Sequence, residues 1–212
     1  KYGLDKPVLV QYKIYLQQLL QGDLGVSYKL QKNVPVTKII ADSFPISAKI
    51  GAMAIGFALL LGIPLGCLSA LKRGKWEDSV IRVVSTLGIA VPSFVIATAS
   101  MLIFAIELNL LPTYGLSDTS SYILPVFTLG FYPMCYITRL MRSSMLDSLG
   151  HDYIRTARAK GMSEFIVTFK HALKNSLIPV ITYLGPLVAF TLTGGFVVEK
   201  VFNIPGLGRY FI

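Results

Sequence analysis

The residue types that usually carry catalysis or bind metals are sparse in this sequence. Its two histidines are His151 and His171, and its two cysteines, Cys67 and Cys135, lie far apart within apolar segments. A metal site needs a cluster of such ligands, and acid–base catalysis needs a positioned pair of groups. The sequence also lacks a glycine-rich nucleotide loop and a nucleophile-elbow motif. We therefore interpret the histidines as surface groups and the cysteines as buried thiols, and predict no catalytic or metal site.

A long polar stretch is the better candidate for function. Residues 152–179 form a basic, helix-forming island between very apolar segments, whereas a connection between two helices needs only a few residues. Gly161 stands between an alanine-rich turn and a second helical piece, where a helix-ending glycine is expected. In that piece, apolar and basic residues recur on separate helical faces. The apolar face contains Phe165, Phe169, Ala172 and Leu173, and the basic face contains Lys170, His171 and Lys174. This pattern predicts a surface that contacts a partner, and a loop lying on lipid headgroups is the alternative.

Composition favours a membrane protein. Of the 212 residues, 53% are hydrophobic and 15% are charged, and the mean hydropathy is +0.62. Soluble domains contain about 25% charged residues, and a soluble fold of this size could not bury so much apolar surface. The net charge of +9 would also suit a nucleic-acid-binding protein. However, the basic residues lie in loops between apolar runs, which is typical of membrane proteins and excludes a continuous nucleic-acid surface.

Four apolar segments are long enough to cross a bilayer: they cover about residues 46–71, 79–106, 123–141 and 177–198. Gly62 and Gly66 in the first segment have the spacing of a close helix contact. Each segment contains an internal proline: Pro64, Pro92, Pro133 and Pro186. These prolines either shape a cavity and permit movement between two states, or reflect the tolerance of membrane helices for proline. Both readings remain open.

Loop charges orient the segments. The turn after the first segment contains Lys72, Arg73 and Lys75, and residues 139–174 contain seven basic residues, whereas residues 107–122 contain none. The positive-inside rule therefore places the two basic loops in the cytoplasm and the neutral loop outside. The tail from Glu199 then also lies outside, with a turn around Pro205.

No acidic residue or lysine occupies the middle of a predicted span. Five charged residues lie close enough to segment ends for their side chains to reach water: Lys49, Arg82, Glu107, Arg139 and Glu199. Ion-coupled carriers usually keep charged groups near the midplane of the membrane. Any energy for transport must therefore come from another subunit.

The N-terminal 45 residues are the only other long polar stretch. Asp5 is expected to cap a helix that has Pro7 in its first turn. Five apolar residues would share one face of this helix: Val8, Tyr12, Tyr15, Leu16 and Leu19. We expect an amphipathic helix at the membrane surface, and simple packing on the bundle explains the pattern at least as well.

Three motifs together resemble one family. The run from Arg155 to Lys174 resembles the cytoplasmic coupling loop of ABC-importer permeases, whose pattern is Glu-Ala-Ala, a spacer, Gly, a longer spacer and Ile-x-Leu-Pro. The residues that match this pattern are Ala157, Gly161 and Leu173. The residues that differ from it are Arg155, Thr156, His171 and Lys174. Within this family, the chain resembles the B-type permease of the oligopeptide/dipeptide branch in particular. The resemblance rests on the loop and on two further motifs: Gly-Asp-Leu-Gly-Val-Ser at 22–27 and Val-Phe-Asn-Ile-Pro-Gly-Leu-Gly at 201–208.

The resemblance implies an all-α integral membrane fold. This would be a polytopic helix bundle of the ABC type I importer kind, with four membrane helices seen of an expected six and a short cytoplasmic coupling helix. Residues 1–45 would be an extracytoplasmic segment with the amphipathic helix, and residues 46–212 the transmembrane permease domain, with its coupling loop at 150–176. The first and last helices are expected beyond the ends of this sequence.

The resemblance also implies a function and partners. The chain would be the membrane-spanning permease subunit of a peptide importer in a bacterial cell membrane. It would form the translocation pathway with a second homologous permease, two cytoplasmic ATPases and an extracytoplasmic peptide-binding protein. The permease itself would be neither an enzyme nor a cofactor-binding chain, since ATP and Mg would be bound by the ATPases. Glutathione, nickel chelates and signalling peptides remain open as substrates.

The coupling loop supplies the expected site residues. Five are expected to contact the ATPase: Arg158, Gly161, Ser163, Glu164 and Phe165. Phe169 and Leu173 are expected to hold the helix to the bundle, and Ala157 and Met162 complete the set. Substrate-binding residues are not identifiable from the sequence.

A self-sufficient secondary carrier or channel for small solutes is the alternative function. A midplane charge, a filter-like carbonyl loop or an internal repeat would favour it, and the sequence contains none of these. An intramembrane enzyme is a third possibility, but the residues for its chemistry are missing.

Overall fold

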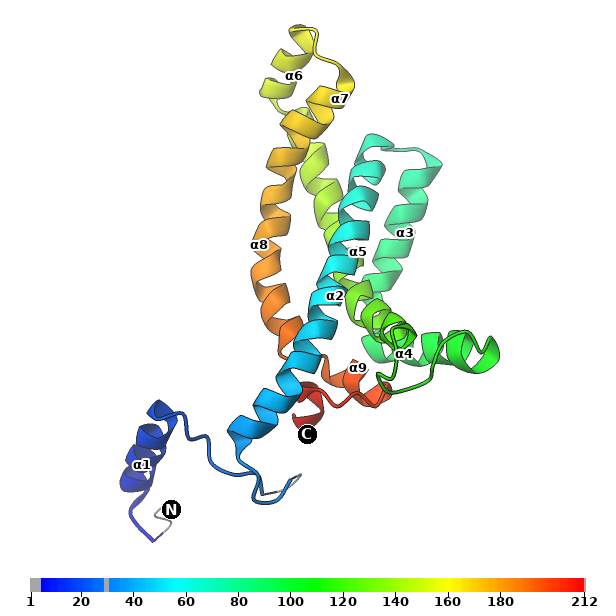
Figure 1. Ribbon diagram of the computed structural model, residues 1–212. Coiled ribbons are helices and arrows are strands. Elements are labelled where there is room, and N and C mark those ends of the chain that lie inside the picture. The colour runs from blue at the N-terminus through cyan, green and yellow to red at the C-terminus, as the bar shows by residue number, and fades with distance from the viewer. Residues whose placement is uncertain (1–4, 29–30, 212) are drawn as a thin grey trace.

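The computed structural model describes residues 5–28 and 31–211 (Figure 1). This part of the chain is helical, apart from connecting loops and one isolated bridge between Val26 and Pro35. The α-helices are α1 (Val8–Leu20), α2 (Val36–Leu71), α3 (Trp76–Ala90), α4 (Ser93–Ser100), α5 (Ile123–Gly150), α6 (Asp152–Ala159), α7 (Glu164–Ile166), α8 (Leu173–Leu192) and α9 (Phe196–Val201). Two π-helical segments cover Met101–Glu107 and Val167–Ala172, and two 3₁₀ turns cover Ser120–Tyr122 and Leu207–Tyr210.

Helices α2 and α5 form the centre of the bundle, and α3 and α8 each pack against both of them. The predicted close approach at Gly62 and Gly66 is confirmed. A Cβ atom on Gly62 would lie 2.9 Å from the carbonyl oxygen of Met134, and one on Gly66 would lie 2.6 Å from that of Thr138. Glycine is therefore required at both positions, because any side chain would push α2 away from α5.

Within residues 5–28 and 31–211, three helical stretches are long and apolar enough to cross a membrane: Val36–Leu71, Ser120–Gly150 and Glu164–Val201. Each is longer than the apolar segment seen in the sequence. The first is extended only at its N-terminal end, since both versions end at Leu71, and the other two are extended at both ends, so hydropathy alone placed these boundaries too far inward.

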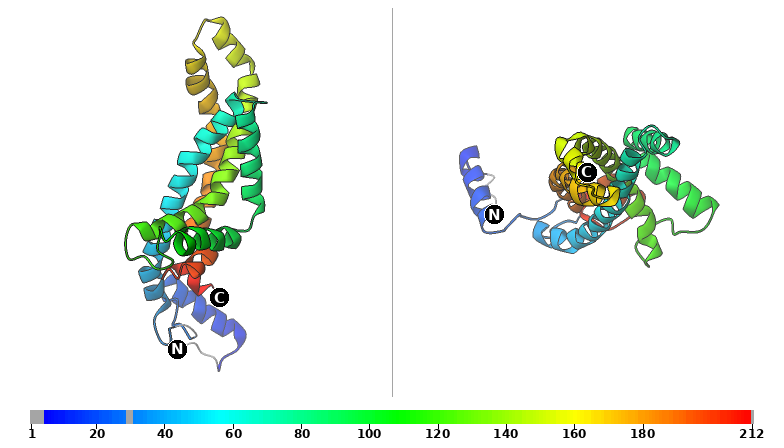
Figure 2. Two further views of the ribbon diagram at one scale, coloured as in Figure 1. Left: turned by 90° about the vertical axis from the view of Figure 1, so that its right-hand side faces the viewer. Right: turned by 90° about the horizontal axis from the view of Figure 1, so that it is seen from above.

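The second predicted span, residues 79–106, is not one continuous helix. Helix α3 ends at Ala90, and the chain turns by 105° before α4 and the π-helical segment that follows it. Val91 is extended, with φ −80° and ψ 126°, because the ring of Pro92 disfavours the helical conformation of the preceding residue. As a result, α4 runs across the end of the bundle rather than along it (Figures 1 and 2). A fourth span exists only if this bent pair counts as one.

The tail end of the bundle, residues 194–211, is built around a buried carboxylate. Glu199 was expected to reach water, but its exposed fraction is 3%. The hydroxyl of Ser47 on α2 donates a hydrogen bond to Glu199 Oε1 at 2.7 Å and accepts one from the amide of Leu207 at 2.8 Å. A Cβ atom on Gly206 would overlap the Glu199 carboxylate. Because the turn of 205–208 closes over Glu199, the side chain cannot extend outward.

Helix α1 differs from its expected start. Pro7, rather than Asp5, occupies the position before the first helical residue, and its carbonyl oxygen accepts hydrogen bonds from Val10 and Gln11. Asp5 therefore lies too early in the chain to cap this helix. None of the residues of α1 is fully buried.

Candidate functional site

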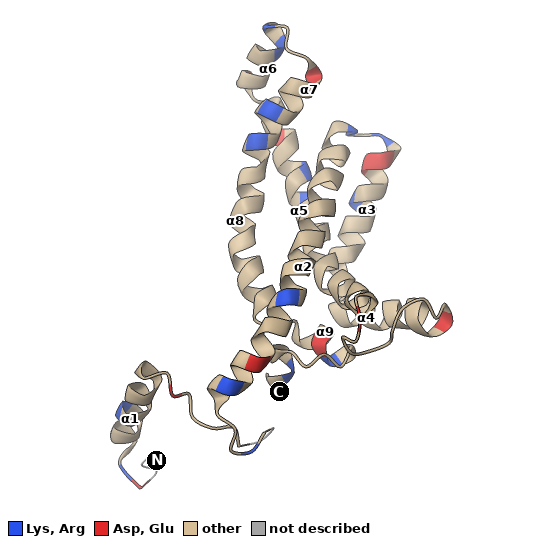
Figure 3. Cartoon of the chain, in the orientation of Figure 1, with Lys and Arg blue, Asp and Glu red and all other residues tan. Residues whose placement is uncertain are grey.

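The predicted coupling loop projects from one end of the bundle. Helix α5 ends at Gly150, α6 follows after His151, and a turn at 160–163 leads back toward the bundle. Figures 1 and 2 show α6 and α7 extending beyond the ends of α2 and α3, while both termini lie at the opposite side of the molecule. We call residues 150–176 the loop end. Figure 3 shows Lys and Arg residues at α6, at the start of the helix that leads into α8 and on the neighbouring parts of α3 and α5.

Gly161 ends α6 in a Schellman motif. Its φ is +74°, its amide donates a hydrogen bond to the carbonyl oxygen of Arg158 at 2.9 Å, and the amide of Met162 donates one to that of Ala157 at 3.3 Å. The predicted helix-ending role of this glycine is thereby confirmed. No atom outside the local chain lies within 4 Å of where a Cβ would stand, so this glycine is needed for its backbone conformation rather than for space.

An ion pair spans the turn around Gly161. The Nε and Nη2 atoms of Arg158 donate hydrogen bonds to Glu164 Oε1 and Oε2 at 2.8 Å and 3.1 Å. This bidentate hydrogen bonding to the carboxylate raises the pKa of the Arg158 guanidinium above its usual range. Both side chains remain solvent-exposed, so the pair fixes the shape of the turn more than it stabilises the fold.

The helix after the turn is not a separate coupling helix. Residues 164–192 run without a break through α7, the π-helical segment Val167–Ala172 and α8. The second half of the predicted loop is therefore the first part of the last long helix, and the only short separate helix at the loop end is α6 among the described residues. A displacement of the loop would consequently act directly on α8.

The two predicted aromatic residues lie on the surface together. Phe165 is 70% exposed and Phe169 is 50% exposed, with their ring centroids 4.6 Å apart. The expectation that Phe169 holds the helix to the bundle is therefore wrong. It assumed regular α-helical spacing, but the π-helical segment changes the residue spacing, so that Ala172 faces inward and Phe169 outward. Leu173 does pack against the core, as expected.

Buried residues anchor the loop end to the bundle. Ile154 and Ala157 of α6 pack in the same core cluster as Val167, Ala172 and Met145, and Met162 packs against its edge. Ala157 is thus an anchor and not a surface residue. The remaining predicted contact residues are exposed: Arg158, Gly161, Ser163, Glu164 and Phe165. Ile166 is also exposed beside Phe165 and was not expected.

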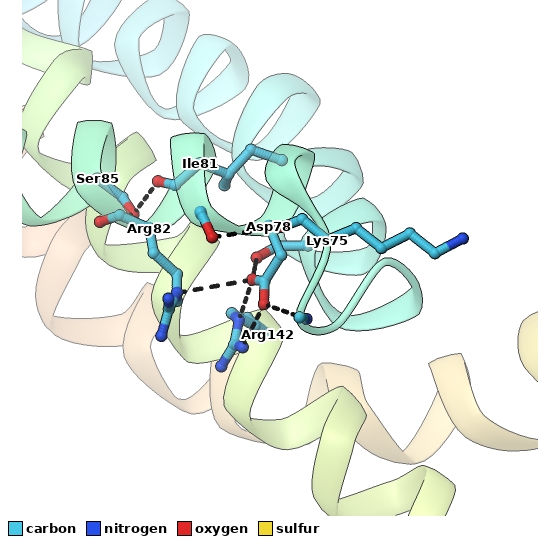
Figure 4. A network of polar contacts seen from close by, with 9 residues as sticks. Lys75, Asp78, Ile81, Arg82, Ser85 and Arg142 are labelled. Carbon is cyan, nitrogen blue, oxygen red and sulfur yellow. Dashed lines mark hydrogen bonds and ion pairs between the residues drawn. The ribbon is translucent and has the colours of Figure 1, made fainter.

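A second polar cluster lies near the loop end and was missed from the sequence (Figure 4). The carboxylate of Asp78 accepts hydrogen bonds from Arg142 Nε at 2.7 Å and Nη2 at 2.8 Å, from Ser69 Oγ at 2.6 Å and from the amide of Gly74 at 3.0 Å. Its side chain is 2% exposed. Asp78 thereby ties α2, the turn to α3 and α5 together. The only sequence feature that could have indicated this cluster is the position of an acidic residue in the first turn of a helix.

Comparison with known proteins agrees with this architecture. Residues 62–212 match the family described as "Binding-protein-dependent transport system inner membrane component". The chain is 44% identical over 211 residues to the dipeptide transport system permease protein DppB of Lactococcus lactis subsp. cremoris, covering 100% of this chain and 69% of that protein. It is 44% identical over 214 residues to the oligopeptide transport system permease protein OppB of Haemophilus influenzae, covering 100% and 70%.

A third relative is the oligopeptide transport system permease protein OppB of Escherichia coli, which is 41% identical over 215 residues. The family match and the long apolar helices together make this chain an integral membrane protein, and the resemblance noted in the sequence is confirmed. The chain belongs to the family of inner-membrane components of binding-protein-dependent transport systems.

Proposed function

We propose that this chain is the permease subunit of an ATP-driven importer of short peptides in a bacterial cell membrane. The names of its relatives, a dipeptide and an oligopeptide transport permease, support this substrate class. The proposed assembly contains a second, homologous permease, two cytoplasmic ATPases that bind ATP and Mg, and an extracytoplasmic peptide-binding protein.

The observation that carries the proposal is the exposed aromatic pair on an anchored projection. Phe165 and Phe169 present contiguous apolar surface at the tip of the loop end, where an aqueous loop would not keep them without a partner. We assign this surface to the ATPase, with Arg158, Gly161, Ser163 and Glu164 around it. Ala157, Met162 and Leu173 support it from the core side.

The connection of this surface to the bundle supports a coupling role. Val167 and Ile154 are fully buried and share a core cluster with Met145 of α5. A force on Phe165 would therefore move α8 and α5 together, because a packed core transmits a displacement instead of absorbing it. ATP-driven closure of the two ATPases would in this way change the packing of the membrane helices.

A cavity at the α3–α4 bend is the proposed segment of the translocation pathway. It has a volume of about 650 Å³ and lies among α3, α4, α5, α8 and α9. Three of the four span prolines, Pro92, Pro133 and Pro186, line it. Tyr183 also lines it, with its ring centroid 4.5 Å from that of Tyr136. This arrangement favours the reading in which the prolines shape a cavity.

The proposal is tested with Phe165→Ala in the complete transporter, with peptide uptake and peptide-stimulated ATP hydrolysis measured together. An aromatic residue at the centre of an interface contributes about 2 kcal/mol or more, so both activities should fall by roughly 30-fold while the amount of inserted protein is unchanged. Phe94→Ala is the matched control, because Phe94 is an exposed aromatic residue of α4, far from the loop end. Normal uptake by Phe165→Ala, or equal damage in the control, would contradict the coupling role.

A further inference from the structure

A groove between α3 and α5 contains three arginines from two helices. It has a volume of about 560 Å³, and its polar lining consists of the three arginines and two hydroxyl residues: Arg82, Arg139, Arg142, Thr86 and Ser143. Val83 and Leu87 of α3 form an apolar wall. The groove is separate from the coupling surface and from the cavity at the α3–α4 bend.

The positive charge of this groove is not balanced by its surroundings. Asp78 is the only carboxylate that pairs with these arginines among the described residues, and it is shared by two of them. Arg142 holds it through two hydrogen bonds, and Arg82 Nε lies 3.9 Å from the same Oδ1 atom (Figure 4). Arg139 has no ion pair in the described part of the chain. The groove thus holds three guanidinium groups but only one paired carboxylate, and two positive charges remain available to a ligand.

Asp78 also fixes the geometry of the groove. Because its side chain is buried behind the arginines and held by Ser69 and Gly74, it orients Arg142 without blocking the groove. Arg142 uses two of its five N–H donors in this pair, which leaves donors for an anion. Preorganised guanidinium groups are well suited to phosphate oxygens.

The apolar wall identifies the surface around the groove as lipid-facing. Val83 and Leu87 are 58% and 59% exposed, and they lie on an outward stripe of α3 with Val80 and Val84. Trp76, which is 74% exposed at the start of the same helix, has the character of an interfacial anchor.

The arginines lie at the depth of the lipid headgroups in the membrane. About 20 helical residues cross the hydrocarbon core, so a span entering the membrane near Ile123 reaches the opposite interface near Arg139 and Arg142. Basic pockets between membrane helices at this depth bind acidic headgroups. The groove therefore places its charges at headgroup level and its apolar wall beside the acyl chains.

We propose that this groove binds one anionic phospholipid from the leaflet at the loop end. The acidic headgroup lies on Arg82 and Arg139, with a further donor from Arg142, and an acyl chain lies along Val83 and Leu87. Because Asp78 and Arg142 join α2, α3 and α5, a bound lipid stabilises the contact between α3 and the centre of the bundle.

The test compares phosphatidylglycerol with phosphatidylcholine in the purified complete transporter, with bound lipid counted by native mass spectrometry. The parent protein should retain one phosphatidylglycerol under conditions that remove phosphatidylcholine. Arg82→Gln combined with Arg139→Gln should weaken this binding at least tenfold. Replacing both by Lys should weaken it less, because the charges remain.

The matched control is Arg73→Gln combined with Lys75→Gln. It removes two positive charges from the same end of the bundle but outside the groove, and its lipid binding should equal that of the parent. Equal retention of the two lipids, or equal loss in the control, would overturn the proposal. Displacement of phosphatidylglycerol by inorganic phosphate would identify a free-anion site, and displacement by a short peptide would identify a peptide site. Either result would also overturn it.

Discussion

Gly161 at the loop end and Gly206 at the tail end are required for different physical reasons. At the loop end, Gly161 has a positive φ and open space around it, so only its backbone conformation requires glycine. At the tail end, Gly206 has an extended backbone, with φ −89° and ψ −180°, but no space for a side chain against Glu199. The loop end is thus constrained by local geometry and keeps its side chains available to a partner. The tail end is constrained by packing and has little freedom to change.

The largest expected effect concerns the polar cluster around Asp78, which joins α2, α3 and α5. Arg142→Met removes the bidentate partner of a buried carboxylate, and breaking such a pair costs about 3–5 kcal/mol. The thermal unfolding midpoint of the purified protein should therefore fall strongly. Lys72→Met is the control, because its contact with Glu77 is 3.7 Å long and the Lys72 side chain is 42% exposed. An unchanged midpoint for Arg142→Met would mean that Asp78 does not hold the helices together.

A smaller effect tests the packing at the tail end. Gly206→Ala places a methyl group against Glu199 and Ser47, and overpacking of this kind costs about 1–3 kcal/mol. Gly185→Ala on α8 is the matched control, since no other atom lies within 4 Å of its Cβ position. Unfolding midpoints and the yield of folded protein measure the difference. If both variants behave alike, the tail end is not the packed region described above.

The smallest effect tests the geometry of the loop end. Gly161→Ala forces a side chain into the left-handed region, which costs about 1 kcal/mol, but it creates no overlap. Global stability should change little, whereas peptide-stimulated ATP hydrolysis should fall because the turn that presents Phe165 is altered. Gly161→Asn should be milder, since Asn tolerates positive φ better. A fall in the unfolding midpoint as large as that of Gly206→Ala would remove the distinction between the two ends.

Local patterns predicted local structure well. The positive φ of Gly161 and the close contacts of Gly62 and Gly66 follow from residue type and spacing, because each depends on a short stretch of chain. Pro92 also signalled a kink, but not its angle of 105°, because the angle depends on what α4 packs against.

Contacts between distant residues were not predictable from those patterns. Asp78 and Arg142 are 64 positions apart, so residue spacing gave no indication that they pair. Glu199 lies near a segment end, and only the fold shows that the turn of 205–208 closes over it. Phe169 was misplaced because the π-helical segment shifts its register, and residue spacing alone carries no sign of that shift.

The hydrogen bond between Ser47 and Glu199 has a consequence for the synthesis of the protein. Its two residues are separated by 152 positions, so at about 5–20 residues per second Ser47 is made roughly 8–30 s before its partner. During that interval α2 is already available for insertion, but its Ser47 hydroxyl lacks both the carboxylate and the amide of Leu207. The tail end therefore cannot close until Leu207 has been made, and a ribosome that stalls before Glu199 leaves an α2 whose Ser47 hydroxyl has neither of these partners.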